Sequence, residues 1–248
     1  MLWDTCAGKQ AMGHISGTLL RLVESQAQVA TLAYVDTLEE QSLLESMLNA
    51  VKPAYPEDSE ALHYLLRTPF RYPPLPWGSR YGRVHEPSIF YGGCTLTTTL
   101  AESAYYRFVF WYSMEGEPVK DSLRSEHTLI SADYGSDLGV RLQLPPFSQH
   151  TAMLMHPQDY AQTQLLGSAM RDAGVEAFEY PSARDIHHGI CVGLFTPNAF
   201  PGKCPRETSQ WLCELRARDL TFKPLGVTDT VHFAIEDFLY LGRLPMPA

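Results

Sequence analysis

The chain has 248 residues with a hydrophobic content of 45% and a charged content of 19%, which is typical of a globular protein with a sizeable core. Its net charge of -9 is the wrong sign for a protein that holds nucleic acid through its own phosphate contacts. Because no apolar stretch is long enough to span a membrane, we expect a cytoplasmic protein with no membrane partner.

The first elements in the chain are predicted to be helices. Between residues 15 and 33, leucine, valine and alanine recur at helical spacing among polar residues, which predicts an amphipathic helix. A second helix is expected to begin at Thr37, because the text TLEE forms a capping box with Glu40, and to end before Pro53.

A third, short helix is expected over residues 57–66. We therefore interpret residues 1–60 as a helical N-terminal extension, which serves either as a small subdomain or as a surface for a homodimer. Residues 61–248 are interpreted as the main domain.

The composition changes after Thr68, where the text FRYPPLPWGS cannot continue a helix because proline removes donors and restricts the preceding residue. A loop or an extended edge is expected there. The text SIFYGG then predicts a short strand ended by glycines, and residues 99–114 predict a helix rich in aromatic side chains.

Strands and one helix are expected in the remainder of the chain. HTLISADY is interpreted as a strand, residues 157–173 as a helix ended by Gly174, and VEAFEY and ICVGLF as two more strands. WLCELRARDLTFKPL and TVHFAIEDFLYL suggest a further pair. This order of elements predicts an α+β fold with a mixed sheet rather than a regular βαβ alternation.

Two kinds of site are not indicated by the motifs. Neither GxGxxG nor GxxxxGK[ST] occurs, so side chains must hold any dinucleotide. The five cysteines are never spaced as CxxC, and His187, His188 and Cys191 lack an evident fourth ligand, so we expect neither disulfides nor a metal.

Four residues stand at regular spacing in the centre of the chain: Arg71, Arg80, Tyr91 and Glu102, the last three each eleven residues apart. Two guanidinium groups and one carboxylate suggest a site for an anionic substrate, because guanidinium matches phosphate oxygens bidentately. Each also has an ordinary structural interpretation. The arginines would be solvated surface residues, Tyr91 a core aromatic, and Glu102 the last member of a capping box that begins at Thr99.

The segments FRYPP, GSRYG, FYGG, TLAE and YPSARD resemble, in this order, the characteristic blocks of the RES-domain family over roughly residues 61–200. The resemblance implies an ADP-ribosyltransferase-like fold and NAD as the substrate, with no further cofactor. It also implies a toxin that is neutralised by a cognate antitoxin, and that the antitoxin carries the DNA-binding part.

The resemblance assigns catalytic roles to Glu102 and Arg71. Glu102 would stabilise the cationic sugar that forms as nicotinamide leaves, and the arginines would hold phosphate groups. Arg67 lies one helical turn before Arg71 and is the alternative for the first arginine.

The resemblance assigns NAD binding to Arg80, Tyr91 and Ser182, with Arg184 assisting Ser182; a serine between Pro181 and Ala183 is otherwise an ordinary turn residue. The expected reaction is transfer of ADP-ribose to inorganic phosphate or water with release of nicotinamide. A protein acceptor, or a catalytically silent module that binds a nucleotide or a partner, are the alternatives.

Overall fold

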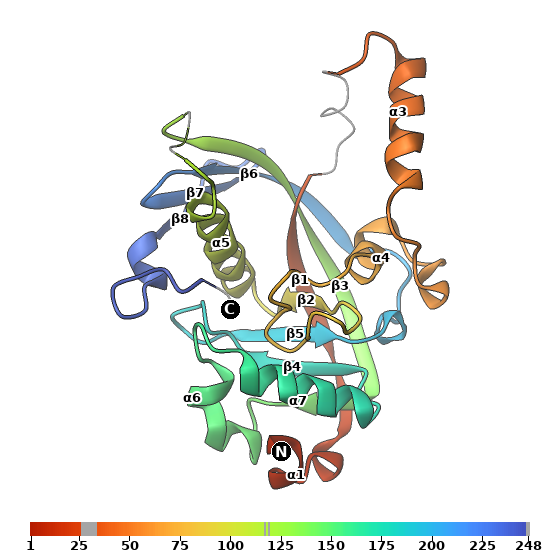
Figure 1. Ribbon diagram of the computed structural model, residues 1–248, viewed down its shortest axis with the longest axis vertical. Helices are drawn as coiled ribbons and strands as arrows, with labels where there is room; N and C mark the ends of the chain where they lie inside the picture. The colour runs from red at the N-terminus through yellow and green to blue at the C-terminus, as the bar shows by residue number, and fades with distance from the viewer. Residues whose placement is uncertain (26–33, 117, 119, 247–248) are drawn as a thin grey trace.

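Figure 1 shows the computed structural model of the chain, which describes residues 1–25, 34–116, 118 and 120–246. The molecule combines helices with an eight-stranded mixed sheet of order β1-β2-β5-β4-β3-β6-β7-β8. The predicted α+β class is therefore confirmed. Because β1 also pairs with β3, five of these strands close into a ring, and β6, β7 and β8 extend from it.

All but one of the neighbouring strand pairs are antiparallel, the exception being β3 with β4. The bounds of the strands are β1 Gly13–Glu24, β2 Phe90–Gly93, β3 Leu123–Arg141, β4 Ala177–Pro181, β5 Ile190–Leu194, β6 Glu207–Leu215, β7 Asp219–Pro224 and β8 Val231–Ala234.

The described helices differ greatly in length. The α-helices are α1 Leu2–Thr5, α3 Leu38–Ala50, α4 Tyr64–Arg71, α5 Leu96–Tyr112, α6 Thr151–Leu154 and α7 Ala161–Asp172. The short 3₁₀ helices are η1 Gly8–Ala11, η2 Glu57–Ser59, η3 Phe147–His150, η4 Pro197–Ala199 and η5 Ile235–Phe238. No helix in these described ranges has the length and apolar character needed to cross a membrane.

The helix predicted over residues 15–33 is wrong where the structure describes it, because residues 13–24 form strand β1. Residues 26–33 of that prediction lie outside the described residues. β1 pairs antiparallel with β3 from Ser16 opposite Gly135 to Glu24 opposite His127, a partner more than one hundred residues away. Such long-range pairing overrides a local pattern that matches a helix.

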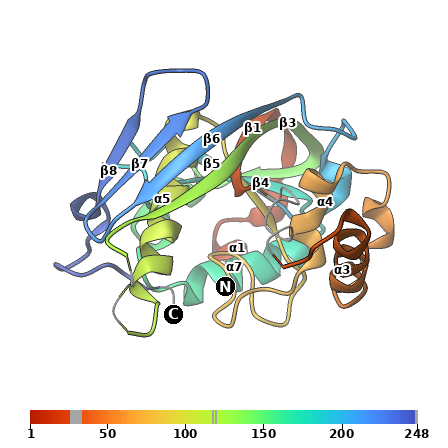
Figure 2. The same cartoon turned by 90° about the horizontal axis from the view of Figure 1, so that it is seen from above.

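The second predicted helix is confirmed as α3. The hydroxyl of Thr37 accepts a hydrogen bond from the backbone N–H of Glu40 at 3.2 Å, as expected of an N-cap. The carboxylate of Glu40 accepts from Asp36 N rather than from Thr37 N, so the capping box is displaced by one residue. Figures 1 and 2 show α3 standing beside α4, away from the sheet.

The third predicted helix is only partly right. Residues 57–59 form a single 3₁₀ turn, and α4 begins later, at Tyr64, and continues to Arg71 with Pro69 inside it. The loop expected after Thr68 therefore begins at Tyr72, where the backbone becomes extended.

The strand at SIFYGG, the aromatic helix, the helix ended by Gly174 and the strands that contain HTLISADY, VEAFEY and ICVGLF are confirmed as β2, α5, α7, β3, β4 and β5. The C-terminal third holds three strands rather than a pair, because WLCELRARDLTFKPL turns back on itself between β6 and β7. The division of the chain at residue 60 stays a prediction, although β1 is a member of the sheet that the later strands build.

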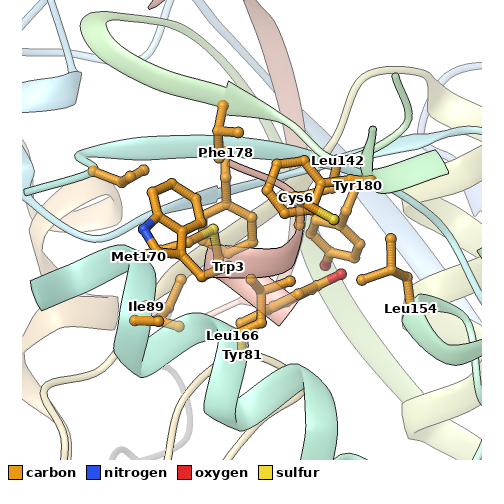
Figure 3. Packing of buried hydrophobic residues seen from close by; sticks show 14 of the residues in the cluster. Trp3, Cys6, Tyr81, Ile89, Leu142, Leu154, Leu166, Met170, Phe178 and Tyr180 are labelled. Atoms are coloured by element: carbon orange, nitrogen blue, oxygen red, sulfur yellow. The ribbon is translucent and has the colours of Figure 1, made fainter. Parts of the chain in front are cut away.

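The core lies on both faces of the sheet. Figure 2 shows α5 and α7 on the same side of the curved strands. Figure 3 shows the cluster between α1, α7 and this side, where Trp3, Tyr81, Leu166 and Phe178 meet. A second cluster packs α5 against β6 and β7. The third cluster joins α4 and η4 to side chains of alternate strand residues, which point to the opposite face.

Candidate functional site

A cavity of about 630 Å³ opens between α5, β1, β2 and the proline-rich segment after α4. Its volume is in the range of small-molecule sites in proteins. Side chains from distant parts of the chain line it, including Arg21, Ser79, Arg80, Tyr91, Glu102, Tyr160, Tyr180, Arg184 and Cys191.

The two glycines that follow Tyr91 allow α5 and β1 to approach β2. A Cβ at Gly92 would lie 2.8 Å from the backbone oxygen of Leu20, and one at Gly93 would lie 2.9 Å from the backbone nitrogen of Thr99. Only glycine permits such close backbone approach without a shift. The FYGG text therefore has a packing role, because it sets the second turn of α5 directly against the cavity.

Glu102 lies in the second turn of α5 and lines the cavity. The capping-box interpretation of Glu102 is wrong, because α5 begins three residues before Thr99 and Thr95 is its N-cap, accepting from Thr98 N at 3.2 Å. The Oε1 atom of Glu102 instead accepts hydrogen bonds from Ser182 Oγ at 2.5 Å and from Cys191 Sγ at 3.7 Å. Within the described residues, both of these contacts fall on the same carboxylate oxygen.

Ser182 is fully buried and lies behind Glu102 rather than in the cavity wall. Its hydroxyl oxygen accepts hydrogen bonds from the backbone N–H groups of Arg184 and Asp185, each at 3.0 Å. Because these contacts occupy the acceptor side of the hydroxyl, its own proton is directed to Glu102. Ser182 therefore contacts Glu102 and is not among the residues that line the cavity; its predicted role in NAD binding stays a prediction.

Arg80 lines the cavity and is 8% exposed. Its Nη1 atom donates to the backbone oxygens of Leu154 at 3.2 Å and His156 at 2.9 Å, and its guanidinium lies 4.6 Å from the ring centre of Tyr160. These contacts hold one edge of the guanidinium and fix its plane beside the cavity.

Tyr91 also lines the cavity, and its ring packs edge-to-face with that of Tyr180, with the ring centres 6.2 Å apart. Its hydroxyl lies 2.9 Å from Ser79 Oγ and accepts a hydrogen bond from Tyr81 N at 3.2 Å. Burial raises the pKa of Tyr91 to about 12, so the phenol is neutral at pH 7.

Arg71 does not reach the cavity. Its guanidinium donates to the backbone oxygen of Asn49 in the last turn of α3 and to those of Lys52 and Pro53 just after that helix, and lies 4.3 Å from the ring centre of Tyr55. A cation at the last carbonyls of a helix stabilises that helix. The structure therefore separates Arg71 from the other predicted site residues.

The alternative arginine, Arg67, lies on the same ring of Tyr55, at 4.1 Å, and donates to the backbone oxygen of Glu60 at 3.3 Å. It is not among the residues that line the cavity. Neither arginine near the start of the proline-rich segment belongs to the candidate site.

Arg21 takes a place in the cavity that the sequence interpretation missed. It projects from β1, donates to the backbone oxygen of Tyr91 at 2.6 Å and lies 5.0 Å from the ring centre of Phe90. Burial lowers the pKa of Arg21 to about 10, so it remains charged at pH 7. No signal pointed to it, because the segment around it matched a helix.

Arg184, from the YPSARD text, also lines the cavity and is 5% exposed. It donates to the backbone oxygen of Pro157 at 2.6 Å and to the hydroxyl of Tyr160 at 2.9 Å, and its guanidinium lies 3.5 Å from the ring centre of Tyr105. Asp185 ties the same loop to α5, because it accepts from Thr98 Oγ1 at 2.8 Å.

The charges of this part of the cavity are unequal. Arg21, Arg80 and Arg184 supply three positive charges, and Glu102 supplies one negative charge. In a chain with a net charge of -9, this local excess of guanidinium is suited to a bound anion. A single carboxylate beside it can stabilise positive charge that develops on a bound sugar.

One protein family matches this chain. The family model described as RES domain matches residues 56–216, which is more than half of the 248 residues. No curated protein matches the chain. The matched segment contains Arg80, Tyr91, Glu102 and Ser182 but not Arg21. With this coverage, and with the blocks of that segment gathered around one cavity, the chain belongs to the RES domain family.

Proposed function

We propose that this chain degrades NAD by breaking the bond between nicotinamide and ribose, and that it transfers ADP-ribose to inorganic phosphate or to water. A RES domain is consistent with an NAD-related module of a toxin–antitoxin pair. The observation that supports the proposal is the geometry of Glu102, which faces the arginine-lined cavity while Ser182 holds it at 2.5 Å. We also propose that the sheet and its helices form an ADP-ribosyltransferase-like fold.

In the proposed reaction, the electron pair of the C–N bond leaves with nicotinamide. The positively charged pyridinium becomes a neutral base, so no proton donor is needed for this step. The sugar passes through an oxocarbenium-like state, as in glycoside hydrolysis. The carboxylate of Glu102 stabilises that positive charge more strongly than it stabilises the uncharged sugar, which lowers the barrier.

The acceptor then attacks the anomeric carbon. With inorganic phosphate, one phosphate oxygen forms the new bond and the product is a phosphorylated ADP-ribose; with water, a proton is lost and ADP-ribose is released. Arg21, Arg80 and Arg184 favour phosphate, because they can hold the diphosphate of NAD and still leave donors for a second anion. Arg80 and Arg184 both contact Tyr160 and would share this task.

The proposed setting is the cytoplasm, where NAD and phosphate are both present. A cognate antitoxin with a DNA-binding domain would cover the opening of the cavity. The proposal assigns no resident cofactor, because NAD is the substrate.

The test is to incubate the purified protein with NAD, with and without phosphate, and to follow nicotinamide release. We expect phosphate to accelerate release, and we expect Glu102→Gln to lower kcat by about 10²-fold or more, since a buried electrostatic contact to a transition state contributes on that order. Glu214→Gln is the control, because Glu214 is ion-paired with Arg124 at 2.8 Å and does not line the cavity. Retention of NAD without release would instead identify a binding module.

A further inference from the structure

The cavity has a second polar end, which the proposed chemistry does not use. Helix α5 and strand β1 run side by side along the cavity, joined by two contacts. Thr99 Oγ1 donates to the backbone oxygen of Leu20 at 3.3 Å, and Arg107 Nη1 donates to Glu24 Oε2 at 3.0 Å.

Between these two contacts, the helix and the strand cover about the same distance. Eight residues of helix from Thr99 to Arg107 rise about 12 Å. Four residues of strand from Leu20 to Glu24 rise about 13 Å. Measured along α5, Glu102 and Arg107 are separated by roughly 7.5 Å. The cavity thus reaches from Glu102 to a second group of side chains more than one helical turn away.

The second end is built around Arg107. One of its terminal nitrogens donates to Glu24, the other donates to Ser125 Oγ, and Ser125 Oγ lies 2.9 Å from Nε2 of His127. Glu24, Arg107 and His127 all line the cavity, and the Glu24 side chain is 63% exposed.

The charges at the second end balance. Burial, followed by the charge of Arg107, lowers the pKa of His127 to about 4, so the imidazole is neutral at pH 7. Glu24 and Arg107 then contribute one negative and one positive charge. The end near Glu102, by contrast, has three arginines for one carboxylate.

Aromatic side chains near the second end suit a planar base. Tyr106 directly precedes Arg107 on α5, lines the cavity and is 42% exposed. Tyr64 and Tyr72 line the cavity from α4 and its C-terminal end and are also exposed. Exposed aromatic faces within a cavity offer stacking surfaces to a nucleobase.

We propose that the second end binds the adenosine ribose of the dinucleotide, with Glu24 accepting hydrogen bonds from its 2′ and 3′ hydroxyls, and that Glu24 thereby selects NAD over NADP. This inference rests on the proposed function, since it assumes that the diphosphate occupies the arginine-rich end. The adenosine ribose then lies beside Glu24, and the adenine, which follows the ribose in the dinucleotide, stacks on the aromatic side chains near the second end.

NADP differs from NAD by a phosphate on the 2′ hydroxyl. At the second end this phosphate meets the carboxylate of Glu24, and the nearest cation, Arg107, has both terminal nitrogens engaged by Glu24 and Ser125. Like charges at short range weaken binding, while a carboxylate is a good acceptor for the two hydroxyls of an unmodified ribose. Arg107 acts through Glu24, which it holds in place, and is a positioning residue.

The experiment compares kcat/KM for NAD and NADP in the wild type, in Glu24→Gln and in the control Glu214→Gln. We expect the wild type to prefer NAD. We expect Glu24→Gln to shift the ratio of NADP to NAD by about tenfold toward NADP, because one opposing charge is removed and Arg107 is released for the phosphate. Glu214→Gln should leave the ratio as in the wild type.

Equilibrium binding of ADP-ribose and of ADP-ribose 2′-phosphate, measured by calorimetry on the same proteins, separates this inference from the proposed function. If nicotinamide is not released but ADP-ribose binds more tightly than its 2′-phosphate and Glu24→Gln reverses the order, the selectivity stands and the enzymatic proposal fails. If nicotinamide is released from NAD and NADP with equal kcat/KM, or if Glu24→Gln leaves the ratio unchanged, Glu24 is not the selecting residue. If neither ligand binds, the inference is overturned, while the proposed function is still decided by nicotinamide release.

Discussion

At the scale of single residues, the contact between Ser182 and Glu102 decides how the candidate site is organised. A carboxylate on a helix has several rotamers, and a buried hydroxyl with a fixed proton direction favours one of them. The orientation of Glu102 is therefore determined by the turn that follows β4 as well as by α5.

We expect Ser182→Ala to lower kcat about tenfold or more with little change in KM, because the carboxylate loses its orientation while the binding groups stay in place. Steady-state nicotinamide release at several NAD concentrations measures both constants. Ser168→Ala is a matched control, since Ser168 donates to Glu86 outside the cavity. A rise in KM with kcat unchanged would contradict the positioning role.

The sequence was informative about some site residues and silent about others. Arg80, Tyr91 and Glu102 could be predicted because they stand in short motifs whose glycines and helix start bring them to one wall. Arg71 stands in the same series of residues but lies elsewhere, because its side chain binds carbonyl groups at and beyond the end of α3. Arg21 could not be found, since its place depends on a strand pairing that no local pattern shows.

At the scale of elements, α3 and α4 are connected through Arg71. The guanidinium of Arg71 contacts Asn49 Oδ1 at 3.1 Å and backbone oxygens near the end of α3, and it lies over Tyr55. The residue thus holds a helix that otherwise stands apart from the sheet (Figure 1).

We expect Arg71→Gln to speed amide hydrogen exchange in α3 and to destabilise its packing by about 1 kcal/mol, the usual size of a partly exposed network of this kind. Nicotinamide release should be retained. Arg80→Gln is the contrasting variant, because Arg80 lines the cavity, and it should lose activity without a change in α3 exchange. Loss of nicotinamide release in Arg71→Gln with unchanged amide hydrogen exchange in α3 would show that Arg71 acts in the site after all.

Helices could be predicted from local sequence where a capping residue or a terminating glycine marks one of their ends. The N-cap at Thr37 and the glycine after α7 marked their helices correctly. Residues 13–24 show the opposite case, because their leucines fit a helical period although Gly13 and Gly17 weaken a helix and their hydrogen-bonding partner is β3. Residues 13–24 form a strand because they pair with β3, and the local sequence gives no information about that pairing.

At the scale of the whole molecule, closure of five strands into a ring places β1 beside β2, and residues of both strands line the cavity. β1 pairs with both β2 and β3, and this brings residues near the N-terminus against a helix that begins at Leu96. The α+β class could be predicted from the order of elements, but the closure could not, because it depends on pairing between segments far apart in the chain.

The buried His127 makes the global stability depend on pH. Its pKa is about 4 in the folded protein and near 6.5 when unfolded, so the unfolded chain binds more protons between these values. The stability contribution is present above pH 6.5 and is lost as the pH falls toward 4. We expect a loss of as much as about 3 kcal/mol over this window, from urea unfolding at each pH. His127→Gln should flatten the dependence, and an unchanged slope would exclude His127 as its origin.

The buried hydroxyl of Ser182 behind Glu102 also connects two backbone amides to the cavity, so that their chemical shifts respond to ligand binding. The backbone N–H groups of Arg184 and Asp185 both donate hydrogen bonds to Ser182 Oγ. The hydroxyl of Ser182 in turn donates to the carboxylate of Glu102, which faces the cavity. A ligand that interacts with this carboxylate changes the polarisation of each hydrogen bond in the series. The NMR chemical shifts of these two amides should therefore move when the cavity fills, even though neither amide touches the ligand.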